Sequence, residues 1–139
     1  MRASFFLVIF VYFVYFCSVN TKITVNMLDL ELFELIDHTI RSERIYANIN
    51  LMRSDVMRLF AISRHRLNEL FTNYADGKSF PQYINDLRLN EAHELLLTHP
   101  EMPLLEVARQ VGLTPPNLCR LFKKRYGLAP TQSRESKVE

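Results

Sequence analysis

The sequence predicts an all-α protein in which a seven-helix domain, built around two helix-turn-helix units, follows an apolar N-terminal segment. Three observations support this prediction. Apolar residues recur at helical spacing beyond residue 26, with few strand signals. A pair of short helices joined by a tight turn occurs twice, at a constant offset. The length of 139 residues and the hydrophobic content of 48% fit one ordinary domain with a short appendage.

Composition excludes several classes of protein. The net charge is only +2, so any surface that binds a polyanion has to be local. The three glycines (Gly77, Gly112 and Gly127) are far apart, which excludes a glycine-rich phosphate loop. The two cysteines and four histidines show no metal-ligand spacing, and no catalytic constellation is evident. We therefore expect no enzyme, cofactor, metal or small-molecule site.

Residues 1–26 form a separate apolar segment and linker. From Phe5 to Val19 the sequence is almost wholly apolar and aromatic, which with Ala3 and Ser4 reaches about 17 uncharged residues, the lower limit for a spanning helix. We rank a membrane anchor through residues 5–19 slightly above a start-site error with translation from Met27. Secretion ranks well below both, because bulky residues precede Cys17 where a cleavage site needs small ones.

The domain begins at about residue 27 with a helix predicted over Leu30–Ser42. Its apolar residues (Leu30, Phe33, Ile36 and Ile40) repeat at helical spacing. Its polar face carries acidic residues without lysine or arginine, and these are Asp29, Glu31, Glu34 and Asp37. We expect this face to point away from any polyanion.

The first helix-turn-helix is predicted at about residues 52–75. Helices over Arg53–Phe60 and Arg64–Tyr74 are separated by Ala61 and Ile62, with Ser63 as the N-cap of the second helix. A central helix follows at about Phe80–Thr98, with Ser79 as its cap.

The second helix-turn-helix is predicted at about residues 103–126. It consists of helices over Pro103–Val111 and Pro115–Tyr126, a turn at Gly112 and Leu113, and Thr114 as the cap. We expect Gly112 to adopt a left-handed turn conformation.

The two units are an internal repeat, since an offset of 51 residues aligns six apolar positions without a gap. We interpret all of them as core. The pairs are Val56/Val107, Phe60/Val111, Ile62/Leu113, Leu67/Leu118, Leu70/Leu121 and Phe71/Phe122.

The apolar stripe leaves polar and basic side chains on the outer face of the second helix of each unit. In the first unit these are Arg64, His65, Arg66, Asn68, Glu69 and Thr72. In the second they are Pro116, Asn117, Arg120, Lys123 and Lys124, with Arg125 nearby. Between residues 109 and 137 only Glu135 opposes Arg109, Arg120, Lys123, Lys124, Arg125, Arg134 and Lys137. A duplicated basic face of this kind is typical of a surface that contacts phosphates and base edges.

The sequence resembles the DNA-binding domain of AraC/XylS-type transcription regulators over roughly Leu30 to Ser136. Four motifs carry the resemblance: Arg88-Leu89-x-x-Ala92-x-x-Leu95-Leu96, Val107-Ala108-x-x-Val111-Gly112-Leu113, Leu118-x-x-x-Phe122-Lys123-Lys124, and Gly127-x-x-Pro130. The resemblance implies a seven-helix domain that binds double-stranded DNA asymmetrically, and that recruits or contacts RNA polymerase.

By the pattern of that family, base edges are read by His65, Asn68, Glu69, Pro116, Asn117 and Arg120. Phosphate contacts are expected from Ser63, Arg64, Arg66, Thr114, Lys123 and Lys124. Arg120 suits guanine and asparagine suits adenine, while Glu69 either accepts from cytosine or pairs with Arg64 or Arg66 along its helix. Ser63 and Thr114 act first as helix caps.

Three positions depart from the family pattern: Ala61 replaces a turn glycine, Met57 a small residue, and Ser133 an aromatic residue. The last departure predicts a weakly packed final helix. The first two would suit an alternative function, a helical protein-interaction module that keeps the fold without binding DNA. Our preferred hypothesis is a bacterial, cytoplasmic regulator, tethered to the inner membrane if the anchor is real.

Overall fold

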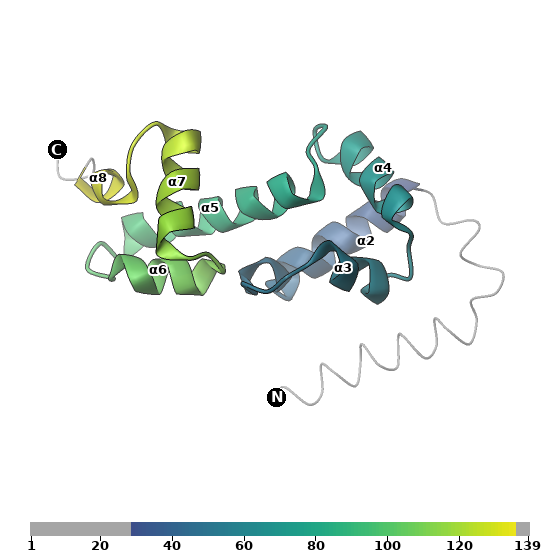
Figure 1. The fold of residues 1–139 in the computed structure, drawn as a ribbon, viewed down its shortest axis with the longest axis horizontal. Helices are drawn as coiled ribbons and strands as arrows, with labels where there is room; N and C mark the ends of the chain where they lie inside the picture. The colour runs from purple at the N-terminus through teal and green to yellow at the C-terminus, as the bar shows by residue number, and fades with distance from the viewer. Residues whose placement is uncertain (1–28, 136–139) are drawn as a thin grey trace, which may run out of the picture. The chain divides into compact units, whose positions relative to one another are not determined.

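The computed structural model describes residues 29–135, and all the regular structure in that range is helical. The described residues form seven α-helices, which are labelled in Figure 1, and one short 3-10 helix. They are α2 (Asp29–Ser42), η1 (Ile45–Ala47), α3 (Arg53–Leu59), α4 (Arg64–Tyr74), α5 (Phe80–Thr98), α6 (Leu104–Val111), α7 (Pro115–Tyr126) and α8 (Pro130–Glu135). The predicted all-α class is confirmed.

The predicted membrane anchor at residues 5–19 lies outside the described residues. Within the described range, no helix has both the length and the apolar character needed to cross a membrane. The packing described below is that of the compact unit from Phe33 onward.

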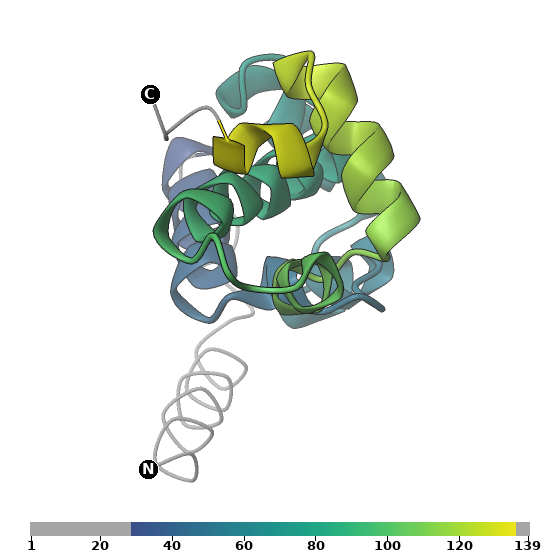
Figure 2. The ribbon, with the colours of Figure 1, turned by 90° about the vertical axis from the view of Figure 1, so that its left-hand side faces the viewer.

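Helix α5 is the centre of this unit, because it packs against α4, α6, α7, α8 and η1. In Figure 1 the α3–α4 pair lies near one end of α5 and the α6–α7 pair near the other. Figure 2 shows α7 and α8 beside α5 in a view from the second of these ends. The central helix therefore carries one short-helix pair at each end, as predicted.

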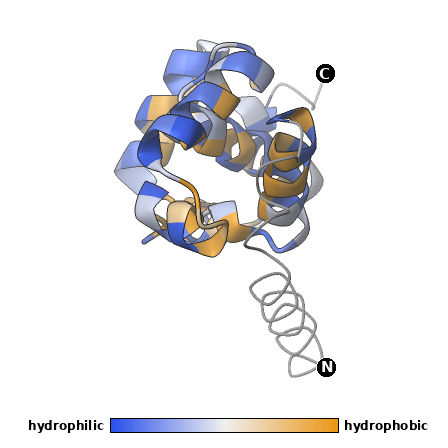
Figure 3. Ribbon diagram, turned by 90° about the vertical axis from the view of Figure 1, so that its right-hand side faces the viewer, coloured by the Kyte–Doolittle hydropathy of each residue, from blue (hydrophilic) through white to orange (hydrophobic). Residues whose placement is uncertain are grey.

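Each end has its own buried core, and Figure 3 shows hydrophobic helix faces turned inward. At the first end the ring of Phe71 meets those of Phe33, Phe80 and Tyr83 edge-on, at centroid distances of 5.4, 5.5 and 5.0 Å. Edge-to-face contacts of this kind each stabilise the fold by about 0.5–1.5 kcal/mol beyond the contribution from burying the rings.

The second core is formed mainly by aliphatic side chains of α5, α6 and α7. Its fully buried residues include Leu96, Val107, Val111, Leu118 and Phe122. The ring of His93 stacks on Tyr126 at 4.9 Å, so this histidine packs at the edge of the core.

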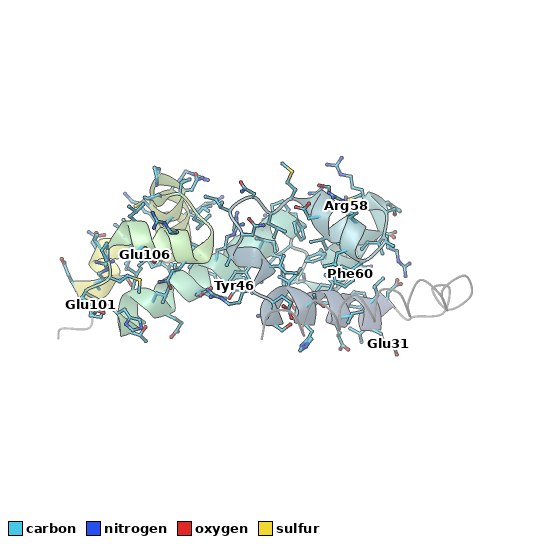
Figure 4. All side chains as sticks on the ribbon, turned by 90° about the horizontal axis from the view of Figure 1, so that it is seen from below. Glu31, Tyr46, Arg58, Phe60, Glu101 and Glu106 are labelled. Carbon is cyan, nitrogen blue, oxygen red and sulfur yellow. The ribbon has the colours of Figure 1, made fainter. Side chains whose placement is uncertain are left out.

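The 3-10 helix η1 was not predicted, because its sequence lacks any periodic pattern. Arg44 precedes it in a left-handed conformation with φ of 50°. Arg88, only 9% exposed, donates from Nε to the carbonyl of Tyr46 at 2.6 Å and from Nη2 to that of Asn48 at 2.8 Å. Figure 4 shows Tyr46 where η1 meets α5 and α6. A buried side chain of the central helix thus fixes η1.

Three predicted helix ends shift by one residue. Helix α2 begins at Asp29, α3 ends at Leu59, and α6 begins at Leu104 with Pro103 as its N-cap. The prediction of a weakly packed final helix is wrong. Ser133 in α8 is only 3% exposed, and Arg134 Nη2 donates to the carbonyl of Met102 at 2.5 Å. A small residue at position 133 is compatible with this close packing of α8 against α5.

Candidate nucleic-acid interface

The two helix-turn-helix units share the same turn at the level of single hydrogen bonds. The amide of Ile62 donates to the carbonyl of Met57 at 3.0 Å, and 51 residues later Leu113 donates to Ala108 at 2.9 Å. Ala61 and Gly112, which precede the two donors, both have positive φ, 51° and 78°. The Ala61 and Met57 departures therefore leave the turn intact.

The N-caps of the two second helices are also equivalent. Ser63 Oγ accepts from the amide of Arg66 at 3.1 Å, and Thr114 Oγ1 accepts from the amide of Asn117 at 3.4 Å. A cap of this kind stabilises a helix by about 1 kcal/mol. Both hydroxyl groups thus act as caps, as predicted, at the exposed start of the helix.

The apolar stripe of the repeat is buried as predicted at three aligned pairs, Val56/Val107, Leu67/Leu118 and Phe71/Phe122. In each of the other three pairs one member is half-buried: Phe60, Ile62 and Leu121. Burial of this stripe directs the opposite faces of α4 and α7 outward.

On α4 the predicted readers His65, Asn68 and Glu69 are all exposed. His65 Nε2 lies 3.2 Å from Glu69 Oε1, one helical turn away. His65 is therefore a helix partner of Glu69, a pairing that the sequence did not suggest. Arg64 is exposed, whereas Arg66 is half-buried.

On α7 all the predicted contact residues are exposed: Thr114, Pro116, Asn117, Arg120, Lys123 and Lys124. Among the described residues, no ion pair or side-chain hydrogen bond engages Arg120, Lys123 or Lys124. Their charges are directed to solvent, available to an external anion.

Three other cations of this basic region have partners within the described residues, whereas Lys137 lies outside them. Arg109 Nη1 lies 3.7 Å from Glu106 Oε2, and Arg134 reaches the carbonyl of Met102. Arg125 pairs with Asp86 at 2.7 Å and donates to Asn90 at 2.9 Å. Fewer cations of this region are thus available to an external anion than the sequence suggested. The available ones, Arg120, Lys123 and Lys124, lie on α7.

Asp86 also joins the two ends of the domain. Its Oδ1 pairs with Nη1 of Arg125 in α7 at 2.7 Å. Its Oδ2 pairs with Nζ of Lys78, in the segment that follows α4, at 2.8 Å. Sequence analysis missed this carboxylate, because nothing in its local pattern distinguishes it from any exposed helix residue.

Sequence analysis also missed the contact that makes Gly112 necessary. A Cβ atom at this position would lie 2.5 Å from the carbonyl oxygen of Ala47 in η1. The predicted positive φ is confirmed, and the close backbone approach is a second reason for glycine.

Two helix-turn-helix units in one chain, each with polar or basic side chains along its second helix, define a DNA-binding domain. A sequence profile for the helix-turn-helix domain matches residues 56–136, more than half of the chain. The chain therefore belongs to this helix-turn-helix family, of AraC type, which is a family of DNA-binding transcription regulators.

Solved structures agree with this assignment. The C-terminal domain of AraT, a response regulator from Geobacillus stearothermophilus, is 25% identical with a TM-score of 0.69, over 76% of this chain and 84% of that one. The C-terminal domain of the response regulator yesN from Fusobacterium nucleatum is 31% identical with a TM-score of 0.65, over 73% of this chain and 95% of that one. A search of curated proteins finds no match.

Proposed function

We propose that this protein binds promoter DNA sequence-specifically by inserting α4 and α7 into successive major grooves. The observation that carries the proposal is the duplicated unit, with its turn bond, its cap and its outward polar face repeated 51 residues apart. Such a unit presents its second helix to the groove.

The length of α5 suits this arrangement. Its 19 residues span about 28 Å at roughly 1.5 Å per residue. One turn of B-DNA is about 34 Å, so a rigid helix of this length can hold two readers against neighbouring grooves on one side of the duplex.

The contacts divide by chemistry. Arg120, Asn117, Pro116, Asn68, His65 and Glu69 are proposed to face base edges, with Arg120 suited to the two acceptors of guanine. Lys123, Lys124, Arg64, Arg66 and the exposed starts of the helices at Ser63 and Thr114 are proposed to contact phosphates. The pairing of His65 with Glu69 means that Glu69 has to leave its partner, or share it, in order to accept from cytosine.

We place the domain, residues 27–139, in the cytoplasm with its DNA. A contact with RNA polymerase is proposed from the family alone. The alternative of a protein-interaction module rested on Met57 and Ala61, and no observation in the described residues now favours it.

The test is selection of random DNA by the purified chain, followed by affinity measurements against salt concentration. We expect an asymmetric site with two preferred blocks about one helical turn apart. We also expect affinity to fall steeply with salt, as it does when several phosphates are contacted. A single block would contradict the two-groove arrangement, and no binding at low salt would contradict DNA binding itself.

A further inference from the structure

One cavity in the described structure is lined by positively charged side chains but by no acidic residue that could balance them. It lies between the start of α3 and helix α5, with a volume of about 190 Å³. Two arginines line it, Arg53 and Arg88, together with Asn85 and the apolar residues Leu51, Phe80 and Ile84. No acidic residue is among the lining residues.

Arg88 brings a buried positive charge to this cavity. Its two hydrogen bonds go to neutral carbonyl groups of Tyr46 and Asn48, and no carboxylate of the described residues pairs with it. Burial lowers the pKa of Arg88, and no neighbouring acid opposes that shift. Because buried charges are normally paired, this guanidinium lacks the anion that proteins usually provide.

Arg53 adds a second, independent anomaly. Its Nε is buried and has no hydrogen-bond partner within the described structure. The offset of 51 aligns Arg53 with Leu104, which packs against the second core. The first unit therefore places a cation where the repeat otherwise has an aliphatic side chain, and packing alone does not explain the substitution.

The larger cavity of the domain provides a contrast. It is lined by three acidic and three basic residues, and each of the three basic residues pairs with an acidic one: Arg41 with Asp37, and both Lys78 and Arg125 with Asp86. The cations of this larger cavity are therefore satisfied internally. The Arg53–Arg88 cavity differs in combining unpaired cations with apolar walls.

We propose that the Arg53–Arg88 cavity binds a small organic carboxylate. The two guanidinium groups would hold the carboxylate, as arginine forks do. The apolar walls would contact a short carbon chain, which an inorganic anion would leave uncovered. The volume is below the roughly 300–1,000 Å³ of sites for drug-sized ligands, so the ligand has to be small. This proposal does not depend on DNA binding.

The test uses the full chain with propionate as the probe, and chloride at the same ionic strength and pH as the reference. Propionate at about ten times its dissociation constant should raise the Tm by about 5 °C relative to chloride. The NMR signal of the Arg53 Nε–H group should shift with the same concentration dependence.

The variant Arg53→Leu restores the residue of the second unit, so it should fold and lose both responses. Its matched control is Arg58→Leu, which removes the same charge from an exposed position on the same helix and should keep both. Arg53→Lys keeps the charge without the fork and should bind propionate at least about fivefold more weakly.

Three results would overturn the proposal. They are no propionate response up to about 100 mM, equal responses in the Arg53→Leu and Arg58→Leu variants, and an equal response to inorganic phosphate. If Arg53→Leu instead weakens DNA binding while propionate has no effect, the anion is a DNA phosphate, and the proposal is again wrong.

Discussion

The two helix-turn-helix units have nearly the same backbone but differ in the charges on their second helices. On α4 the predicted readers include an internal pair, His65 with Glu69, and the basic residues are mixed with an acid. On α7 the exposed cations Arg120, Lys123 and Lys124 have no partner within the described residues. If DNA binds as proposed, we expect α7 to contribute more of the attraction to a polyanion than α4.

The turns of the two units differ as well. The first turn uses Ala61, an exposed residue, at φ of 51°. The second uses Gly112, which is buried against η1. A turn that merely bends the chain tolerates a side chain, whereas one that also docks against another backbone requires glycine.

The largest effect should come from Gly112→Ala, because a Cβ here combines a left-handed φ with a 2.5 Å contact to the carbonyl of Ala47. We expect a loss of about 3–4 kcal/mol in the free energy of unfolding, measured by chemical denaturation. The matched control is Gly127→Ala, which has φ of 77° at the C-cap of α7 but no atom within 4 Å of the added Cβ. It should lose about 1–2 kcal/mol. Equal losses in the two variants would show that the approach of η1 is not what makes Gly112 necessary.

Arg120→Ala should change sequence preference on the side of the second unit. Loss of a bidentate contact would relax discrimination at one base pair by about 1–3 kcal/mol. Competition between the selected site and single-base variants measures this. Asn68→Ala is the counterpart on α4 and should relax a different base pair, in the other block. If both variants lose affinity equally on every sequence, the base-reading assignment fails.

Lys123→Ala should weaken binding to all sequences alike, by about 1 kcal/mol. The slope of log affinity against log salt concentration should become shallower by about 0.9. Arg125→Ala is the matched control on the same helix, since Asp86 and Asn90 already engage this cation. Its salt slope should stay close to that of the wild type, and an equal change would mean that Arg125 leaves Asp86 to contact DNA.

A smaller effect distinguishes the two cores at alkaline pH. Burial, and then the hydrogen bond and charge of Asp37, raise the pKa of Tyr83. The folded-state pKa therefore exceeds the unfolded value of about 10, so the contribution of Tyr83 is complete below about pH 10 and is lost as the pH rises further. Tyr83→Phe should flatten the alkaline decline in stability.

Tyr126 in the second core is the matched comparison. Burial also raises the pKa of Tyr126, but its hydroxyl donates to the neutral carbonyl of Leu89 and not to a carboxylate. Tyr126→Phe should therefore change the alkaline decline less than Tyr83→Phe. Thermal unfolding between about pH 8 and pH 11 compares the two variants, and an identical decline in both would contradict the role assigned to Asp37.

The helices could be predicted from the sequence because their signals are local. Caps at Ser63 and Thr114 and apolar periodicity fix the helix boundaries to within about one residue. The repeat offset likewise predicted which faces of α4 and α7 are exposed. These features depend only on residues within one or two turns of each other.

What could not be predicted depends on contacts between distant segments. Three contacts of this kind join residues far apart in the sequence. Arg88 donates hydrogen bonds to η1, the backbone of Ala47 lies close to Gly112, and Asp86 pairs with both Lys78 and Arg125. The pairing of Glu69 with His65 is local but was not suggested by the sequence. His65 lies four residues before Glu69 and Arg66 lies three before it, so both are within reach along the helix and spacing alone does not select between them.

If both units bind DNA as proposed, the tandem repeat fixes the orientation of the protein on its binding site. Two identical subunits related by a two-fold axis meet a palindrome in the same way from either end. Here a mixed-charge reader always precedes a cationic one along a single rigid helix, so turning the complex around exchanges unlike surfaces. A binding site for this protein would thus be asymmetric, and its orientation would decide which flank of the DNA lies next to α4 and which lies next to α7.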